Sequence, residues 1–202
     1  MTDRETKILL KGCRNGTPEA QKELYRLYAS DMFKVCLMYA KDYDSANDLL
    51  QEGFLKVFQK IHLFKFQKHG SLGGWIRTIV VHNCVDHYRS DHWSKNKQEL
   101  SFEETENAHH QLLKEEEEEE SIYLKDDFLR ILKQLPEGYS VVLNLFYLEG
   151  YTHKEIAAKL EITEGTSKSQ LFKAKKYLRQ LLLENLSEEE IERYEGFGRK
   201  VV

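Results

Sequence analysis

The stretch YTHKEIAAKLEITEGTSKSQLFKAKKYLRQ, residues 151–180, decides the fold. Thr152 and Glu155 stand in the T-x-x-E pattern of a capping box, which begins a short helix. A turn follows at Glu161, and Thr163 is placed to cap a second, longer helix. Two capped helices joined by a short turn predict a helix-turn-helix, whose second helix can enter the major groove of DNA.

The second of these helices divides into an apolar stripe and a polar side. Leu171, Ala174 and Leu178 recur at helical spacing and are expected to face inward. Hydroxyls and amides near the start of a groove-bound helix can reach base edges, and lysines farther along suit phosphates. The candidate DNA contacts on the exposed side are Thr166, Ser167, Ser169, Gln170, Lys173 and Lys176. The alternative is an ordinary pair of helices with a solvated lysine face.

Two more helical segments precede this motif, in 122–135 and 141–146, where apolar residues recur every three or four positions. Gly150 is expected to end the second of them. Together with the helix-turn-helix they form a predicted domain over residues 122–183, and a charged tail, 184–202, follows.

Residues 1–90 predict a separate helical domain. Its first predicted helix has Thr17 as the N-cap and Pro18 at the first helical position. A second helix is expected to open at Asp44 or Ser45. A glycine-containing basic loop then leads into a third helix, which is expected to run from about Leu72 to Arg89.

Charge separates the two domains. The whole chain carries a net charge of -4, but residues 1–90 are net +4 and residues 91–125 are net -7. Residues 91–121, with the run Glu115–Glu120, are too charged to form a core and predict a flexible acidic linker. The predicted fold is therefore all-α: two small helical domains joined by this linker, the second containing the helix-turn-helix.

No enzyme or metal site is visible in the sequence. It contains no HExxH, GxxxxGK[ST] or GxGxxG motif. His82, His87 and His92 recur every five residues, which turns about 140° around a helix and puts them on different faces. We therefore expect no catalysis, no cofactor and no metal.

The cellular setting is predicted from cysteines and apolar stretches. Cys13, Cys36 and Cys84 lack CxxC spacing and predict reduced, mostly buried thiols in the cytoplasm. The apolar stretch Val141–Leu148 is far too short to span a bilayer, and the first residues carry no apolar signal segment. We expect a cytoplasmic protein without membrane insertion.

The predicted helix SANDLLQEGFLKVFQKI, residues 45–61, has a mixed polar side. Its apolar stripe is complete without Leu55, which instead aligns with Asp48, Gln51 and Gln59. An aliphatic residue within a polar stripe is a candidate contact for another protein. The alternative is a single exposed leucine, which is common and carries no function.

The segment FKFQKHGSLGGWIRTIVVHNCVDHYR, residues 64–89, joins basic and aromatic residues in a loop and a helix. Aromatic and cationic side chains side by side can stack on unpaired bases and hold their phosphates. The alternative is structural, with Trp75, Ile76 and Ile79 in the core and Phe64 and Phe66 closing the end of the domain.

Three segments, taken in their order along the chain, resemble an extracytoplasmic-function (ECF) sigma factor. These proteins are the smallest group of the bacterial sigma family. The three segments are DLLQEGFLKVFQKI, GSLGGWIRTIVVHNCVDHYR and LPEGYSVVLNLFYLEGYTHKEIAAKLEITEGTSKSQLFKAKKYL. The resemblance covers about residues 17–183. This chain has His82 where many relatives carry Asn, and Glu161 where many carry Gly. The second departure asks a non-glycine residue to accept a left-handed backbone, which costs about 1 kcal/mol.

The resemblance implies a non-catalytic subunit that binds core RNA polymerase and directs promoter-specific initiation. The implied polymerase contacts are Asp48, Gln51, Glu52, Leu55 and Gln59. The implied contacts to the minus-ten element are Lys65, Phe66, Lys68, Ser71, Trp75, Arg77, His82, Asn83, Asp86 and Arg89. The helix-turn-helix would read the minus-thirty-five element of promoter DNA, and an anti-sigma factor is an implied partner.

Two other classes of protein remain open at this point. One is a stand-alone helix-turn-helix transcriptional regulator, and the other is an interaction protein whose acidic linker is the binding part. The first domain favours the sigma factor, because a regulator has no need of DLLQEGFLKVF.

Overall fold

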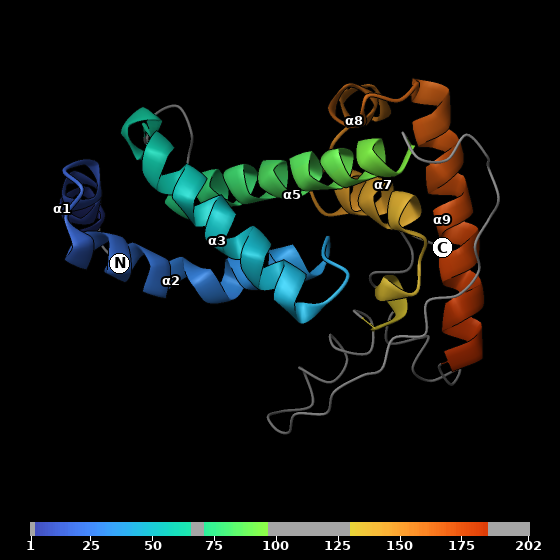
Figure 1. Cartoon of the computed structure of the whole chain (residues 1–202), viewed down its shortest axis with the longest axis horizontal. Coiled ribbons are helices and arrows are strands. Elements are labelled where there is room, and N and C mark those ends of the chain that lie inside the picture. The colour runs from blue at the N-terminus through green and yellow to red at the C-terminus, as the bar shows by residue number, and fades with distance from the viewer. Residues whose placement is uncertain (1–2, 66–70, 97–129, 186–202) are drawn as a thin grey trace. The chain divides into compact units, whose positions relative to one another are not determined.

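All secondary structure in the described residues is helical (Figure 1). The computed structural model describes residues 3–65, 71–96 and 130–185. The described helices form two compact units, which divide between Tyr88 and Arg89. The prediction of an all-α fold with two helical domains is therefore confirmed. None of the described helices is long and apolar enough to cross a membrane.

The first unit is built from helices that the sequence largely predicts. They are α1 (Asp3–Arg14), α2 (Pro18–Leu37), α3 (Tyr43–Lys60), the 3-10 helix η1 (Ile61–Leu63) and α5 (Leu72–Asn96). Thr17 occupies the N-cap position of α2, as predicted. The carboxylate of Asp42 caps α3 by accepting a hydrogen bond from the backbone N–H of Ser45 at 2.7 Å. The helix therefore begins at Tyr43, slightly before the predicted start.

Two helix boundaries differ from the prediction. Sequence analysis assigned no element before Thr17, but α1 lies there, with Thr6, Leu10 and Cys13 on its buried side. Helix α5 continues past Arg89, because residues 90–96 contain no Gly or Pro to stop it. The start of the predicted linker is thus helical.

Other expectations fall outside the part of the chain that the structure describes. They concern the rest of the acidic linker with its run Glu115–Glu120, and most of the charged tail. The three cysteines, by contrast, are described, and all are free and buried. Their predicted burial is confirmed.

Helices α3 and α5 approach closely in the core of the first unit. A β-carbon built on Gly53 would lie 3.2 Å from Cγ2 of Val80, so only a glycine fits there without movement of the neighbour. Nearby, Nδ2 of the buried Asn83 donates a hydrogen bond to the backbone carbonyl of Leu49 at 3.1 Å. These contacts fix which sides of the two helices remain exposed.

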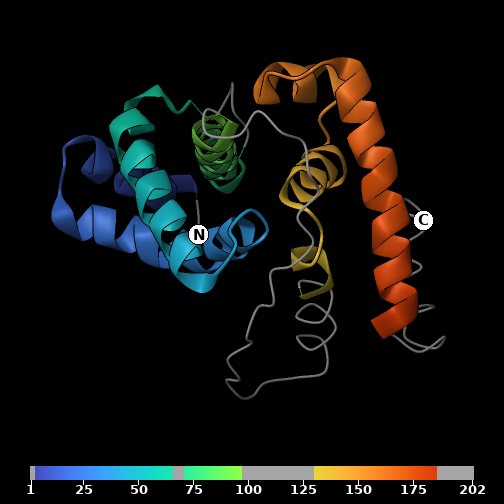
Figure 2. The same cartoon turned by 45° about the vertical axis from the view of Figure 1, so that its right-hand side comes forward.

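The second unit contains α7 (Glu137–Tyr147), α8 (His153–Leu160) and α9 (Glu164–Asn185). Of the preceding predicted helix, 122–135, residues 130–135 are described, and 130–133 of them are helical. Side chains from α7, α8 and α9 form the core; they include Val142, Leu145, Ile156, Ala174 and Leu178. Gly150 lies between α7 and α8 with φ 72, the left-handed conformation that favours glycine. Figure 2 shows α8 meeting the beginning of α9 through a short turn.

Candidate functional site

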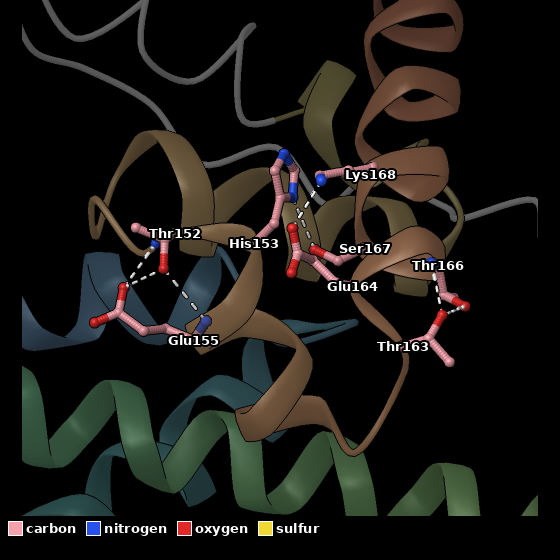
Figure 3. Close-up of polar contacts among 8 residues, drawn as sticks. All are labelled: Thr152, His153, Glu155, Thr163, Glu164, Thr166, Ser167 and Lys168. Atoms are coloured by element: carbon pink, nitrogen blue, oxygen red, sulfur yellow. Dashed lines mark hydrogen bonds and ion pairs between the residues drawn. The ribbon is translucent and has the colours of Figure 1, made fainter.

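Helix α8 begins with the predicted capping box (Figure 3). The hydroxyl and the backbone N–H of Thr152 donate hydrogen bonds to Oε2 of Glu155 at 2.7 and 2.8 Å. The backbone N–H of Glu155 donates to Oγ1 of Thr152 at 3.3 Å. These bonds lower the pKa of Glu155, and the charge of Lys159 lowers it further. The reciprocal cap confirms the predicted start of the helix-turn-helix.

The turn between the two helices depends on Glu161. Its backbone lies in the left-handed region, with φ 58 and ψ 38, and its N–H still donates to the carbonyl of Ala157. Among the described residues, it is the only non-glycine with a positive φ. The left-handed conformation expected at this position is confirmed. It carries a backbone cost of about 1 kcal/mol.

Helix α9 is capped by Thr163, as predicted. Oγ1 of Thr163 accepts a hydrogen bond from the backbone N–H of Thr166 at 3.0 Å and lies 2.8 Å from the Thr166 hydroxyl (Figure 3). In the same turn, Nζ of Lys168 lies 2.7 Å from the carboxylate of Glu164 and lowers its pKa. The first turn of α9 is therefore held by its own side chains.

The predicted DNA-contacting residues of α9 differ in their solvent exposure. Ser169, Lys173 and Lys176 are exposed, and Thr166 and Gln170 are half-buried. Ser167 is fully buried, and the prediction that it lies on the exposed side is wrong. Its Oγ instead lies 3.0 Å from Nδ1 of His153 in α8.

Sequence analysis missed one residue of this exposed side, Phe172. Its side chain is 71% exposed, one helical turn after Ser169 and one before Lys176. The available signal was its position outside the apolar stripe that contains Leu171 and Ala174. An exposed aromatic among hydroxyl and lysine side chains can contact thymine methyl groups.

The exposed side of α3, called here the α3 polar face, lies in the first unit. Its residues are all exposed: Asp48, Gln51, Glu52, Leu55 and Gln59. Leu55 is 61% exposed, whereas Leu49, Leu50 and Phe54 are buried. Leu55 is therefore no part of the core, and the helix has an apolar side chain in the middle of a polar surface.

The loop before α5 is described only in part. Lys65 and Ser71 are exposed, and Phe66 and Lys68 lie outside the described residues. Oγ of Ser71 accepts a hydrogen bond from the backbone N–H of Gly74 at 3.1 Å. Ser71 thus holds the first turn of α5, independently of any role toward DNA.

Trp75, in that first turn, packs against Phe64 with ring centroids 5.4 Å apart. Phe64 is buried, and it closes the end of the domain as the structural alternative holds. Trp75 is half-buried. Phe64 therefore matches the structural alternative, and the DNA contact of Trp75 stays a prediction.

Helix α5 places its predicted DNA contacts unevenly. Trp75, His82, Asp86 and Arg89 follow one side of the helix by spacing; His82 and Asp86 are exposed, and Arg89 is half-buried. Oδ2 of Asp86 lies 3.9 Å from Nζ of Lys56.

The other two predicted contacts on α5 lie off this side. One of them, Arg77, is half-buried. Asn83 is buried and bonded to Leu49, so its prediction as a DNA contact is not compatible with its place in the core. Over the residues that the structure describes, no group of His, Cys, Asp or Glu is placed to hold a metal ion.

Comparison with known proteins matches two family models. The model for Sigma-70 region 2 covers residues 24–94, and the model for Sigma-70, region 4 covers residues 125–178. Together they span more than half of the chain. The first includes the α3 polar face and α5, and the second includes the helix-turn-helix.

Individual proteins are similar along most of the chain. The ECF RNA polymerase sigma factor SigM of Bacillus subtilis (strain 168) is 26% identical over 173 residues, which cover 83% of this chain and 98% of that protein. SigX of the same organism is 26% identical over 172 residues, 83% and 88% of the two chains. Among solved structures, the sigma factor RpoE in complex with the anti-sigma factor NepR from Bartonella quintana is 21% identical. That match covers 81% of this chain and 97% of RpoE, with a TM-score of 0.46.

Proposed function

The chain belongs to the extracytoplasmic-function group of the sigma-70 family, and we propose on that premise that it binds core RNA polymerase and directs promoter-specific transcription initiation. One observation carries the proposal: both sigma regions occur in order in a single chain, each with an exposed surface suited to its partner. The chain is not an enzyme, because the bond-forming chemistry belongs to the polymerase.

Polymerase binding is assigned to the α3 polar face. Protein interfaces commonly bury an apolar side chain at the centre of a ring of polar contacts. Leu55, 61% exposed among carboxylate and amide side chains, supplies that arrangement. The face is separate from the core side of α3, so it can be covered by a partner without any change in the fold.

Reading of the minus-thirty-five element is assigned to the exposed side of α9. Thr166, Ser169 and Gln170 near its start suit base edges, and Lys173 and Lys176 suit phosphates. Phe172 joins this set, because it lies between the two groups and is exposed. Ser167 leaves the set, because it is buried.

Capture of the minus-ten element is assigned to the loop and the exposed side of α5. Aromatic and cationic groups can hold a strand whose bases have been unstacked. The proposed contacts are Lys65, Phe66, Lys68, Ser71, Trp75, Arg77, His82, Asp86 and Arg89. Asn83 leaves the set, because its amide joins α3 to α5.

These roles define the proposed domain limits. Residues 1–90 bind polymerase and the minus-ten element, 91–121 link the domains, and 122–183 bind the minus-thirty-five element before the tail, 184–202. The proposed location is the cytoplasm, where polymerase and promoter DNA lie. An anti-sigma factor is the proposed regulatory partner, as in the RpoE–NepR complex named above.

The second candidate is a stand-alone transcriptional regulator that uses the same helix-turn-helix. Gel filtration of the purified chain with bacterial core RNA polymerase separates the two. Elution of the chain with polymerase supports the sigma factor. Failure to elute with polymerase, together with sequence-specific DNA binding by the free chain, would instead support the regulator.

A further inference from the structure

His153 contacts both α7 and α9 from the start of α8. It is the first residue of α8, directly after the capping residue Thr152. Its ring stacks on Phe146 of α7, with centroids 4.8 Å apart and an interplanar angle of 26°. Its Nδ1 lies 3.0 Å from Oγ of Ser167 in the first turns of α9 (Figure 3). One imidazole ring thus touches both neighbouring helices.

The contact with Ser167 is the polar part of this arrangement. The Ser167 side chain has no exposed surface, and buried hydroxyl groups require a hydrogen-bond partner. Neutral imidazole with its proton on Nε2 accepts the bond at Nδ1, and imidazolium donates it. The bond therefore persists in both protonation states, with the hydroxyl changing its role.

The charged groups around His153 come from the starts of α8 and α9. The Glu164 carboxylate is paired with Lys168 at 2.7 Å, and it also interacts with the charges of His153 and Lys154. The ion pair between Glu164 and Lys168 and the bond between His153 and Ser167 are separate contacts (Figure 3).

The bond between His153 and Ser167 lies at the end of α9 that would meet DNA. Ser169 and Gln170, the residues assigned to base edges, follow Ser167 by two and three positions. The cap from Thr163 holds the first turn of α9 internally, and it does not set the angle of that turn to α7 or α8. Stacking fixes the plane of the imidazole, and the hydrogen bond then fixes Ser167 relative to that plane.

We infer that His153 is a positioning residue for promoter reading, which acts through Ser167 on the aim of Ser169 and Gln170. The inference rests on the proposed function of α9. A residue that only packs would need the ring that covers Phe146. A positioning residue also needs the polar atom at the Nδ1 position.

Three variants separate these contributions. His153→Phe keeps a ring for Phe146 and removes the hydrogen-bonding nitrogen. His153→Asn loses the ring and keeps a polar atom near the position of Nδ1. Ser167→Ala removes the other partner, and His62→Phe makes the same chemical change at an exposed histidine of η1 as a control.

The experiment uses each full-length chain in a holoenzyme reconstituted with bacterial core polymerase. The template is a promoter library randomised in the minus-thirty-five element. The readout is the preference ratio, the enrichment of the best upstream element over the library mean, and circular dichroism measures the folded fraction. We expect His153→Phe and Ser167→Ala to lower the ratio by about tenfold, a loss near 1.4 kcal/mol. His153→Asn should stay within about threefold of wild type, and His62→Phe should be unchanged.

A double variant distinguishes the loss of the His153–Ser167 bond from a general loss of folding. In the Ser167→Ala background, His153→Phe should lower the preference ratio no further, because both act through one bond. The inference is overturned if His153→Phe and Ser167→Ala keep the wild-type ratio, or if His153→Asn falls as far as His153→Phe. Failure of the wild-type chain to start transcription would overturn the proposed function itself, and the inference with it.

Discussion

Glu161 holds a backbone conformation that glycine adopts at much lower cost. Its φ of 58 lies in the left-handed region, where a β-carbon crowds the following carbonyl oxygen. We expect Glu161→Gly to raise the free energy of unfolding of the second unit by about 1 kcal/mol relative to Glu161→Ala. The alanine variant loses the same carboxylate but keeps the β-carbon, so the comparison isolates the backbone.

Amide hydrogen exchange in α8 and α9 measures this difference in the unit that contains the turn. Equal protection in the glycine and alanine variants would mean that the turn carries no strain.

Glu155 makes the second unit sensitive to acid. Its pKa lies below the ordinary value of 4.5, because the hydroxyl and then the backbone N–H of Thr152 bond to the carboxylate. A lowered pKa contributes stability above the unfolded-state value, and that stability is lost as the pH falls through the folded-state value. Glu155→Gln should therefore show a smaller fall in Tm between pH 6 and pH 3 than the wild type. An identical fall in both proteins would contradict the role of the cap.

The burial of two polar residues could not be predicted from the sequence. The apolar pattern treats Ser167 and Asn83 as polar and therefore exposed. Both are buried, because each has a hydrogen-bond partner on another helix, His153 for one and Leu49 for the other. Periodicity identifies the faces of one helix, and a polar residue satisfied by a second helix is invisible to it.

At the scale of single helices, α3 gives the sharpest test of polymerase binding. Leu55→Asp should weaken binding to core polymerase by at least about tenfold, which corresponds to roughly 1.4 kcal/mol. The Tm should hardly change, because Leu55 is exposed and contributes little to the core. Binding is measured by titration of labelled core polymerase.

Leu63→Asp is the matched control, since Leu63 is another exposed leucine of the same unit outside the α3 polar face. If Leu55→Asp unfolds the chain, or if both variants bind polymerase equally well, the assignment of this face is wrong.

Along α9, the residues proposed to contact base edges come before the residues proposed to contact phosphates. Alteration of Ser169 or Gln170 should change which minus-thirty-five sequence is preferred, by roughly 1–3 kcal/mol for each lost base contact. Alanine at Lys173 or Lys176 should weaken all promoters about equally and lower the salt slope by about one unit each. Transcription from a library of upstream elements at two salt concentrations measures both effects. A shift of sequence preference in the lysine variants, without one in the Ser169 and Gln170 variants, would reverse the assignment.

The helices themselves were predictable to different degrees. Residues with explicit start signals, such as Thr152 with Glu155 and Thr163, begin helices where the sequence places them. Helix α1 was missed although Leu10 and Cys13 form a buried side and Gly16, with φ 72, follows its end. The end of α5 was missed because residues 90–96 contain no Gly or Pro to mark where the helix stops.

At the scale of the whole molecule, the distribution of charge and the order of the motifs indicated the function better than any local pattern did. The net charge of -4 conceals a net +4 over residues 1–90 and a net -7 over residues 91–125. A helix-turn-helix alone fits many DNA-binding proteins, and the α3 polar face upstream of it distinguishes a sigma factor from a regulator. The minus-ten contacts stay predictions, and of those on α5 Asn83 is excluded by burial, because much of the circumference of this helix is buried.

The most direct test of the central claim is transcription by bacterial core RNA polymerase on linear promoter-library templates, with and without the purified chain. The account predicts that discrete transcripts start only when the chain is added, from templates that share an upstream and a downstream element at fixed spacing. Leu55→Asp should abolish these starts at limiting polymerase, and Leu63→Asp should not. The account is contradicted if the wild-type chain adds no transcripts beyond those of core polymerase alone.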